Sequence, residues 1–451
     1  MKVIIVGCGR VGQALAEKLN SDGNAVTVID MSPDKVNETT DLADVMGVVG
    51  NGATHTTLRE AGIKAADLFI AVTNSDELNL LCCMIAKKEG GCKTIARLKS
   101  PEYRDEMEYI RTELGLAMVI NPEYAAAEEI ARILRFPTAI KIEPFAKGKV
   151  EIVKFKIPEG SVLIGMSIKD LMIKYPMEVL VGTIERGDES YIAKGDFVFA
   201  EKDVVSIVAT PKNANEFFRK IRRKDPSVHS AMVIGGGVIT HYLCEILEKS
   251  GVALKVIERD ENTCAELAEK FPKYSVICGK PTDKELLAEE GISRVDAFLT
   301  LTNSDEENIL LSLFAKESCD GKLITKIKRT DYDSVIKRLD LDTVICPKNI
   351  TADTIVRFAR SAKHTRGNNI EAMYSLIEEQ VEASEFIIKE KSEIVGTPIS
   401  QLRFKPDVLV ACITRGDKVI IPRGGDTIEE GDAVVVVTKM LGLHDIVDVL
   451  R

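Results

Sequence analysis

Residues 3–12 read Val-Ile-Ile-Val-Gly-Cys-Gly-Arg-Val-Gly, a short apolar run followed at once by three spaced glycines. The run predicts a buried β-strand, and the residues after it place Val11, Leu15 and Leu19 on one face of a helix. A glycine-rich turn between a strand and a helix lets the backbone approach a pyrophosphate and points the first N–H groups of the helix at the phosphates. The alternative is a turn that serves only the close packing of strand and helix.

Asp30 favours the nucleotide interpretation. It ends the next predicted strand, VTVID, where a carboxylate can accept hydrogen bonds from the two ribose hydroxyls. An acid at this position repels a 2′-phosphate, so the sequence predicts NAD(H), or an adenosine nucleotide such as ATP or ADP, in preference to NADP.

The chain alternates between two kinds of pattern. From Val3 to about Leu134, short apolar runs are separated by helical stretches, which predicts βαβ units and a parallel sheet. Further along, apolar and polar residues alternate in strands such as EIVKFKI and VVSIVAT, which indicates a small α+β module. The charged stretch from Arg219 to Asp225, followed by Pro226, predicts a linker.

The sequence is also duplicated. The block Thr-Asn-Ser-Asp-Glu at 73–77 returns letter for letter at 302–306, and Arg-Gly-Asp at 186–188 returns at 415–417. We therefore expect an α/β tandem repeat in which two Rossmann-like parallel-sheet domains are each followed by a small α+β domain. The expected boundaries are 1–136 and 140–223 in the first copy, and 229–360 and 370–451 in the second.

Polar residues follow two of the predicted strands of the first copy. Asn74 and Glu77 are expected to begin a helix in a capping-box-like arrangement. The carboxyl ends of parallel strands meet at the ligand edge of such a sheet, so Thr73 and Asn74 are also expected within reach of a nucleotide. Arg97 ends the strand TIARL at the same edge, where it pairs either with phosphate oxygens or with a surface carboxylate.

The second copy departs from the first at the third glycine, where Thr240 stands. The side chain at Thr240 should push the helix slightly off its strand, so we expect a second site that is weaker, differently selective or empty. Pro281 also replaces Gly52. The matching candidate residues are Gly235, Gly237, Glu258, Thr302 and Lys326.

Composition excludes several classes of function. The 451 residues carry 60 Lys and Arg against 70 Asp and Glu, a net charge of −10, with no Trp and 5% aromatic residues, which argues against nucleic-acid binding. No apolar run approaches the ~18 residues that cross a bilayer, so we expect a cytoplasmic protein without direct membrane insertion.

The ten cysteines form no Cys-x-x-Cys pair and no His-Glu-x-x-His occurs, so no metal site is expected. The pair Cys82-Cys83 fits two reduced thiols on a helix face better than a redox or metal site.

The first Rossmann-like segment, VIIVGCGRVGQALAEKL with VTVID and AGIKAADLFIAVTNSDELNLLCCMIAK, resembles the nucleotide-binding half of RCK domains, the regulators of potassium conductance. The tandem order over the whole chain is similar to the TrkA family of regulatory subunits of potassium transport. This resemblance implies NAD(H) or ATP/ADP as ligand and an integral-membrane Trk-type potassium transporter as partner. It also implies a homo-oligomer, a tetramer giving a ring of eight RCK units, held peripherally at the inner face of the cell membrane.

By motif position, the resemblance assigns nucleotide contacts in both copies. They are Gly7, Cys8, Gly9, Arg10, Val11, Gly12, Asp30, Thr73, Asn74 and Arg97, and, in the second copy, Gly235, Gly237, Glu258, Thr302 and Lys326.

An NAD-dependent dehydrogenase is the main alternative. Such an enzyme needs a proton donor or acceptor beside the nicotinamide. The sequence contains no Tyr-x-x-x-Lys, and neither His55 nor His229 falls at a ligand-edge strand end. We therefore expect a sensor with no catalytic residues. A nucleotide-binding scaffold without a transporter is a further alternative.

Overall fold

The structure, a computed structural model, describes residues 1–104, 106–137, 139–187, 189–221, 228–328, 338–339, 341–364, 370–377, 380–389, 393–440, 443 and 445–450. The chain forms two compact units, and each unit combines two separate segments. The first unit joins Met1–Leu134 with Val228–Val356, and the second joins Arg135–Ser227 with Arg357–Arg451. The predicted linker lies outside the described residues from position 222 to 226, as does Asp188 of the Arg-Gly-Asp repeat.

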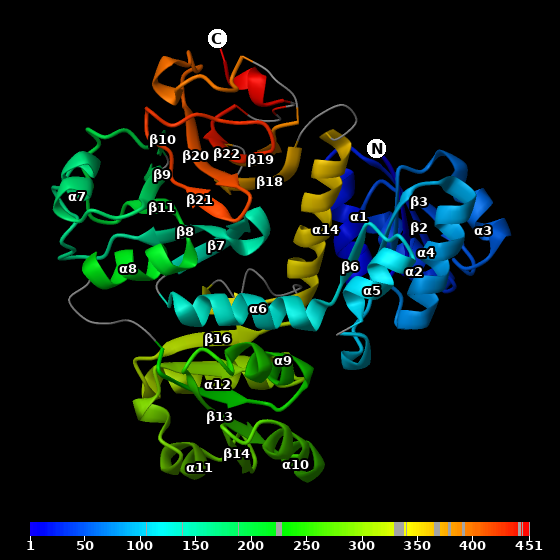
Figure 1. The fold of residues 1–451 in the computed structure, drawn as a ribbon. Coiled ribbons are helices and arrows are strands. Elements are labelled where there is room, and N and C mark those ends of the chain that lie inside the picture. Colours follow the sequence, from blue (N-terminus) through cyan, green and yellow to red (C-terminus); the bar gives the residue numbers. More distant parts are fainter. Residues whose placement is uncertain are drawn as a thin grey trace. The chain divides into compact units, whose positions relative to one another are not determined.

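Within its described residues, the first half of the first unit forms a six-stranded sheet in the order β3-β2-β1-β4-β5-β6, and every pairing is parallel (Figure 1). The strands are β1 (Lys2–Val6), β2 (Ala25–Asp30), β3 (Met46–Val49), β4 (Leu68–Ala71), β5 (Lys93–Arg97) and β6 (Met118–Ile120). The helices are α1 (Arg10–Ser21), α2 (Pro33–Leu42), α3 (His55–Glu60), α4 (Asp76–Gly90), α5 (Met107–Glu113) and α6 (Pro122–Arg135). The strand order reverses direction between β1 and β4, and such a switch point is where doubly wound sheets bind ligands.

The second half of this unit repeats the arrangement, with the described order β14-β13-β12-β15-β16-β17 and parallel pairings. The strands are β12 (Ser230–Ile234), β13 (Ala253–Glu258), β14 (Ser275–Cys278), β15 (Ala297–Thr300), β16 (Lys322–Lys326) and β17 (Thr343–Ile345). The helices are α9 (Val238–Leu247), α10 (Glu261–Lys270), α11 (Lys284–Glu289), α12 (Asp305–Ser318) and α14 (Pro347–His364). Two Rossmann-like parallel sheets are therefore confirmed.

Strand β3 was not expected from the sequence. It pairs with β2 on one side only, as an edge strand, and of its four residues only Val48 is buried. Met46 and Val49 are exposed, so the stretch lacks the apolar run that identified the central strands. The helix face predicted after the glycines is confirmed, since Val11, Leu15 and Leu19 are all buried in α1.

Helix α6 belongs to the first half in sequence and to the second half in packing. Its residues Ala126, Ala127 and Ile130 lie in the same hydrophobic core as Val233 of β12 and Leu243 of α9. The sheet of the second half is thus covered in part by a helix supplied from the first half. In the other direction, Lys18 of α1 forms an ion pair with Asp353 of α14.

The second unit contains two antiparallel sheets, one from each small module. Among the described residues, their orders are β10-β9-β11-β8-β7 and β18-β19-β22-β20-β21. The first module comprises β7 (Ala139–Phe145), β8 (Val150–Lys156), α7 (Ile168–Lys174), β9 (Val179–Arg186), β10 (Glu189–Ile192), β11 (Val204–Ala209) and α8 (Pro211–Ile221). The second comprises β18 (Ile370–Ile377), β19 (Val381–Ile387), β20 (Val408–Arg415), β21 (Lys418–Ile420) and β22 (Ala433–Thr438). The predicted α+β class of both modules is confirmed.

Short 3-10 helices complete the described elements: η1 (Ile63–Ala65), η2 (Pro101–Tyr103), η3 (Ala146–Gly148), η4 (Ile292–Arg294), η5 (Ile399–Gln401) and η6 (Ile446–Val449).

The repeated Arg-Gly pair of the small modules has a structural role. Arg186 donates two hydrogen bonds, of 2.8 and 2.7 Å, to the carboxylate of the buried Asp203. Arg415 does the same to Asp432, at 2.9 Å for both bonds. Bidentate pairing satisfies a carboxylate that would be costly to bury alone, so this repeat stabilises the module.

Candidate functional site

The loop between β1 and α1 requires glycine at two of its positions. Gly7 has φ +103°, and a Cβ there would lie 3.0 Å from the backbone nitrogen of Thr73. A Cβ on Gly12 would lie only 1.8 Å from the carbonyl oxygen of Gly7, so only glycine lets the helix approach the strand this closely. Gly9 has no neighbour within 4 Å of an added Cβ and is exposed, which leaves its surroundings open for a ligand.

Asp30 lies beside this loop and holds it. One carboxylate oxygen accepts a hydrogen bond from the backbone N–H of Cys8 at 2.8 Å, and the other accepts one from Ser32 at 2.9 Å. The side chain is half-buried, so it remains accessible from one side. The structure thus brings the predicted acid and the predicted loop together, and it adds a loop-bracing role that the sequence did not indicate.

The remaining loop residues differ in exposure. Cys8 is buried, and burial raises the pKa of its thiol to about 11. Val11 is buried in the core, whereas Arg10 is exposed at the first turn of α1. Of these side chains, only Arg10 is accessible to solvent.

Thr73 and Arg97 are joined through Asn79, which is fully buried in α4. The side-chain oxygen of Asn79 accepts hydrogen bonds from the N–H and the hydroxyl of Thr73, both at 2.8 Å. Its amide nitrogen donates to the carbonyl oxygens of Arg97, at 2.8 Å, and of Thr73, at 3.3 Å. Asn79 therefore clamps the ends of β4 and β5 together. The repeat of this asparagine as Asn308 was the only sequence signal of that role.

The start of α4 differs from the expectation for Asn74. The capping residue is Ser75, whose hydroxyl accepts from the N–H of Leu78 at 3.2 Å, and Asn74 is exposed one position earlier. The prediction of a cap at Asn74 was wrong because the chain enters the helix one residue later. Asp76 then accepts hydrogen bonds from the N–H groups of Lys99 and Ser100, at 3.0 and 2.8 Å, and so fixes the loop after β5.

Arg97 does not point away from the protein in this structure. Its guanidinium donates to the carbonyl oxygen of Thr73 at 2.5 Å, and burial lowers its pKa. This internal hydrogen bond stands in place of the surface salt bridge, one of the two roles weighed from the sequence, and the phosphate contact stays a prediction.

The second half repeats the geometry with two changes. Gly235 again has a positive φ, +101°, and lies against the backbone of Thr302. Glu258 accepts from the N–H of Gly236 at 2.6 Å and from that of Asp260 at 2.9 Å, as Asp30 does in the first half. Thr240 is fully buried, and its hydroxyl donates to the carbonyl oxygen of Gly235 at 2.5 Å.

Lys326 is the other change. Its amine donates to the carbonyl oxygen of Leu301 at 2.8 Å, and burial lowers its pKa from 10.5 to about 8. The side chain is buried, so its amine contacts the protein interior at the end of the sheet and not solvent. Thr302 and Asn308 reproduce the clamp, with the N–H of Thr302 donating to the Asn308 side chain at 2.9 Å. Gly237 has open space around it, as Gly9 has.

Within the described residues, His, Cys, Asp and Glu side chains form no group that could hold a metal ion. None of the described helices combines the length and the apolar character that crossing a bilayer requires.

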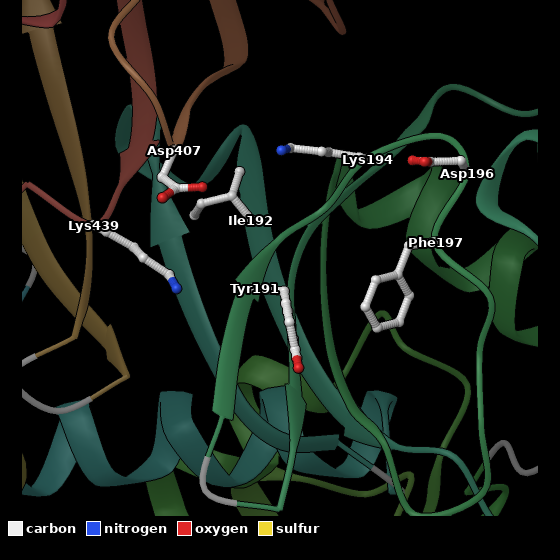
Figure 2. Close-up of a pocket in the computed structure, with 7 residues that line it drawn as sticks. All are labelled: Tyr191, Ile192, Lys194, Asp196, Phe197, Asp407 and Lys439. Atoms are coloured by element: carbon white, nitrogen blue, oxygen red, sulfur yellow. The ribbon is translucent and has the colours of Figure 1, made fainter.

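A cavity of about 240 Å³ lies in the second unit (Figure 2). It is lined by residues of both small modules: Tyr191, Ile192, Lys194, Asp196, Phe197, Asp407 and Lys439. The rings of Tyr191 and Phe197 lie 5.3 Å apart, and the amine of Lys439 donates to the carbonyl oxygen of Ser190 at 2.6 Å. Pockets for drug-sized ligands usually measure ~300–1,000 Å³, so the cavity is small for such a ligand and we assign none to it.

The TrkA-N domain family matches residues 3–122 and 231–347, and the TrkA-C domain family matches residues 152–222 and 383–450. The chain is 34% identical, over 444 residues, to a Trk system potassium uptake protein TrkA homologue of Methanosarcina mazei, and the match covers 97% of both chains. It is 32% identical over 451 residues to the homologue of Archaeoglobus fulgidus, with full coverage of both chains, and 31% identical over 439 residues to TrkA of Vibrio alginolyticus, with 96% and 95% covered.

Solved structures share the fold. A GsuK channel bound to NAD aligns with a TM-score of 0.63 at 17% identity, covering 97% of this chain and 76% of the channel chain. The GsuK RCK domain aligns with a TM-score of 0.63 at 18% identity, covering 97% of this chain and 92% of that one. With both domain families present twice and relatives matching from end to end, the chain belongs to the Trk system potassium uptake protein TrkA family.

Proposed function

We propose that the chain is a regulatory subunit that binds NAD(H), with ATP or ADP as alternative ligands, and gates an integral-membrane potassium uptake transporter of the Trk type. One observation carries the nucleotide part. In each half, a glycine-rich loop at the switch point of a parallel sheet is braced by the acid that ends the neighbouring strand, Asp30 or Glu258. The names of the relatives, which are potassium uptake proteins, support the transport part.

In the first half, the proposed nucleotide contacts are Gly7, Cys8, Gly9, Arg10, Val11, Gly12, Asp30, Thr73, Asn74 and Arg97. Backbone N–H groups at the start of α1 would face the phosphates, and the accessible side of Asp30 would face the ribose. Arg97 donates to Thr73 in this structure, so pairing with a phosphate requires it to exchange that hydrogen bond.

The second half offers Gly235, Gly237, Glu258, Thr302 and Lys326 as the corresponding proposed contacts. Buried Lys326 is less suited to a phosphate than Arg97, because its amine is held inside and its lowered pKa reduces its charge above pH 8. We therefore propose that the two sites differ in affinity or selectivity.

Gating follows from differential binding. A nucleotide shifts a conformational equilibrium only if it binds one arrangement more tightly than the other, so NAD(H) and ATP or ADP must favour different arrangements. We propose a homotetramer that presents a ring of eight RCK units to the transporter at the inner face of the membrane, with four domains per chain at the boundaries given above. With a net charge of −10 and no membrane-crossing helix among the described residues, contact with the membrane would go through the protein partner.

Two experiments test the proposal separately. Calorimetric titration of the full chain with NADH, ATP and ADP tests the nucleotide part, and absence of binding by all three overturns it. Steady oxidation of NADH with a small carbonyl substrate would favour the dehydrogenase instead. Potassium flux into vesicles that hold the transporter, with and without this chain and nucleotide, tests the regulatory part. A flux that never depends on the chain would favour the scaffold.

A further inference from the structure

Cys264 and Cys278 lie together beside Glu258, and none of the functions discussed above uses them. Cys264 is on α10 and Cys278 ends β14, the edge strand that pairs with β13 (Figure 1). The register places Cys278 directly opposite Glu258. The Cys278 thiol is near enough to contribute to the raised pKa of the Cys264 thiol. The sulfur of Cys264 also donates to the carbonyl oxygen of Glu258 at 3.4 Å, and that of Cys278 to the carbonyl oxygen of Arg259 at 4.0 Å.

The pair combines an accessible thiol with a sheltered one. Cys278 is exposed, whereas Cys264 is buried, and burial raises the pKa of the Cys264 thiol to about 12. Redox-sensing cysteines are solvent-accessible and often lie next to a second cysteine that resolves the first oxidation product. In a reducing compartment, disulfides of this kind are transient and regulatory.

The first half supplies an internal comparison. Val36 on α2 occupies the position of Cys264, and Val49 at the end of β3 occupies that of Cys278, since it pairs with Asp30 as Cys278 pairs with Glu258. The same two positions thus carry inert side chains beside the first acid and a dithiol beside the second.

We propose that Cys264 and Cys278 form a reversible dithiol–disulfide pair that modifies the second nucleotide-type site and leaves the first unchanged. The oxidant is a low-molecular-weight disulfide such as oxidised glutathione. The Cys278 thiolate attacks one of its sulfurs, forming a mixed disulfide and releasing one thiol. Cys264 then loses its proton and attacks the Cys278 sulfur, which forms the internal bond and releases the second thiol. Two protein thiols are oxidised, and one small disulfide is reduced to two thiols.

The expected consequence lies at Glu258. A disulfide has a S–S length of ~2.05 Å and a fixed dihedral preference, so it ties α10 to β14 across the carbonyl groups of Glu258 and Arg259. The carboxylate of Glu258 holds the glycine-rich loop through Gly236. The bond therefore changes the support of that loop. Its effect on nucleotide affinity rests on the proposed function, whereas its formation does not.

Peptide mapping of the full chain tests the bond itself. The reduced protein is equilibrated with mixtures of reduced and oxidised glutathione, the remaining thiols are alkylated, and the digest is analysed by mass spectrometry. We expect a linked pair of peptides carrying Cys264 and Cys278 that dithiothreitol separates. The proposal is overturned if both residues stay alkylatable at every ratio, or if Cys278 stops at the glutathione adduct.

Matched variants make the result specific. Replacing both residues with the valines of the first half, Cys264→Val with Cys278→Val, should abolish the linked peptide while keeping the fold. Val36→Cys with Val49→Cys should create one in the first half, because these are the matching positions. Calorimetry on the wild type should show that oxidation changes the affinity of one nucleotide site by about 5-fold or more and that the double valine variant does not respond. If the linked peptide forms and the nucleotide affinity does not change, the disulfide exists but its proposed effect on the second site is wrong.

Discussion

The hydroxyl of Thr240 donates a hydrogen bond to the carbonyl oxygen of Gly235 at 2.5 Å, at the position where the first half has Gly12 and therefore no side chain. A Cβ on Gly12 would lie 1.8 Å from the carbonyl oxygen of Gly7, a separation that no carbon atom tolerates. The helix after the second loop must therefore be seated differently on its strand, and the hydroxyl compensates by satisfying a buried carbonyl group. The two halves therefore bring the helix onto the glycine-rich loop differently, the first with a glycine and the second with a hydrogen-bonded threonine.

Gly12→Ala should destabilise the protein by about 1–3 kcal/mol, because the added methyl group overpacks the contact between α1 and the loop. The midpoint of urea unfolding, followed by circular dichroism, measures the change. Gly9→Ala is the matched control, since its Cβ meets nothing within 4 Å. It should leave the midpoint unchanged and weaken nucleotide binding, because it fills the space that the proposed phosphates use. Equal midpoints for both variants would contradict the geometry.

Asp30→Asn should separate the two roles of this side chain. The amide keeps one oxygen as an acceptor for the loop, places a donor against the other backbone N–H and removes the charge that the ribose hydroxyls would meet. We therefore expect affinity for NADH to fall by about tenfold or more, with a smaller loss of stability than the alanine variant shows. Asp30→Ala removes both acceptors and should in addition lower the free energy of unfolding by about 1–3 kcal/mol. Calorimetry and urea unfolding of the two variants give both numbers. An Asp30→Asn protein that binds NADH as the wild type does would show that the ribose lies elsewhere.

Asn79→Asp should be strongly destabilising, by about 2–4 kcal/mol, because it replaces the amide donor to Arg97 and Thr73 with a buried acceptor. Asn308→Asp should behave in the same way in the second half. Glu77→Gln, two residues before Asn79 and exposed, is the control and should change thermal stability little. If thermal unfolding of Asn79→Asp matched that of the control, the clamp would have no energetic importance.

Lys326 predicts a specific pH dependence. Its pKa falls from 10.5 to about 8 on folding, so between these values the unfolded chain binds more protons than the folded one. Below pH 8 the amine is charged in both states, and its burial lowers the free energy of unfolding by the full amount. As the pH rises from about 8 to about 10.5 this cost is lost, so the free energy of unfolding should increase. Lys326→Met removes this contribution. The difference in unfolding midpoint between wild type and variant, measured across that window, should change with pH, and a constant difference would contradict the burial of a charged amine.

Much of the fold followed from local sequence. Central strands are continuous apolar runs, and the helix after the first glycine loop has one apolar face, so both were visible in the sequence. Strand β3 was missed because Met46 and Val49 face solvent at a sheet edge. The cap moved from Asn74 to Ser75 because both residue types cap helices equally well and only the path of the chain distinguishes them.

The sequence predicted which residues form the candidate site better than it predicted the hydrogen bonds that they make. Glycine spacing and the strand-end acids identified the loop and Asp30. That Asp30 braces the loop, and that Arg97 and Lys326 donate to carbonyl oxygens of their own half, depends on burial at the sheet edge, which no local pattern encodes. The clamp at Asn79 needed tertiary contacts between β4 and β5 to be recognised.

Helix α6 places Ala126 and Ile130 of the first half in the core of the second half. The two halves of the first unit therefore share one core, and loss of this helix would uncover part of the sheet of the second half. The shared core does not make the halves identical: the threonine, the lysine and the pair of cysteines occur in the second half alone of the two matched sets of positions.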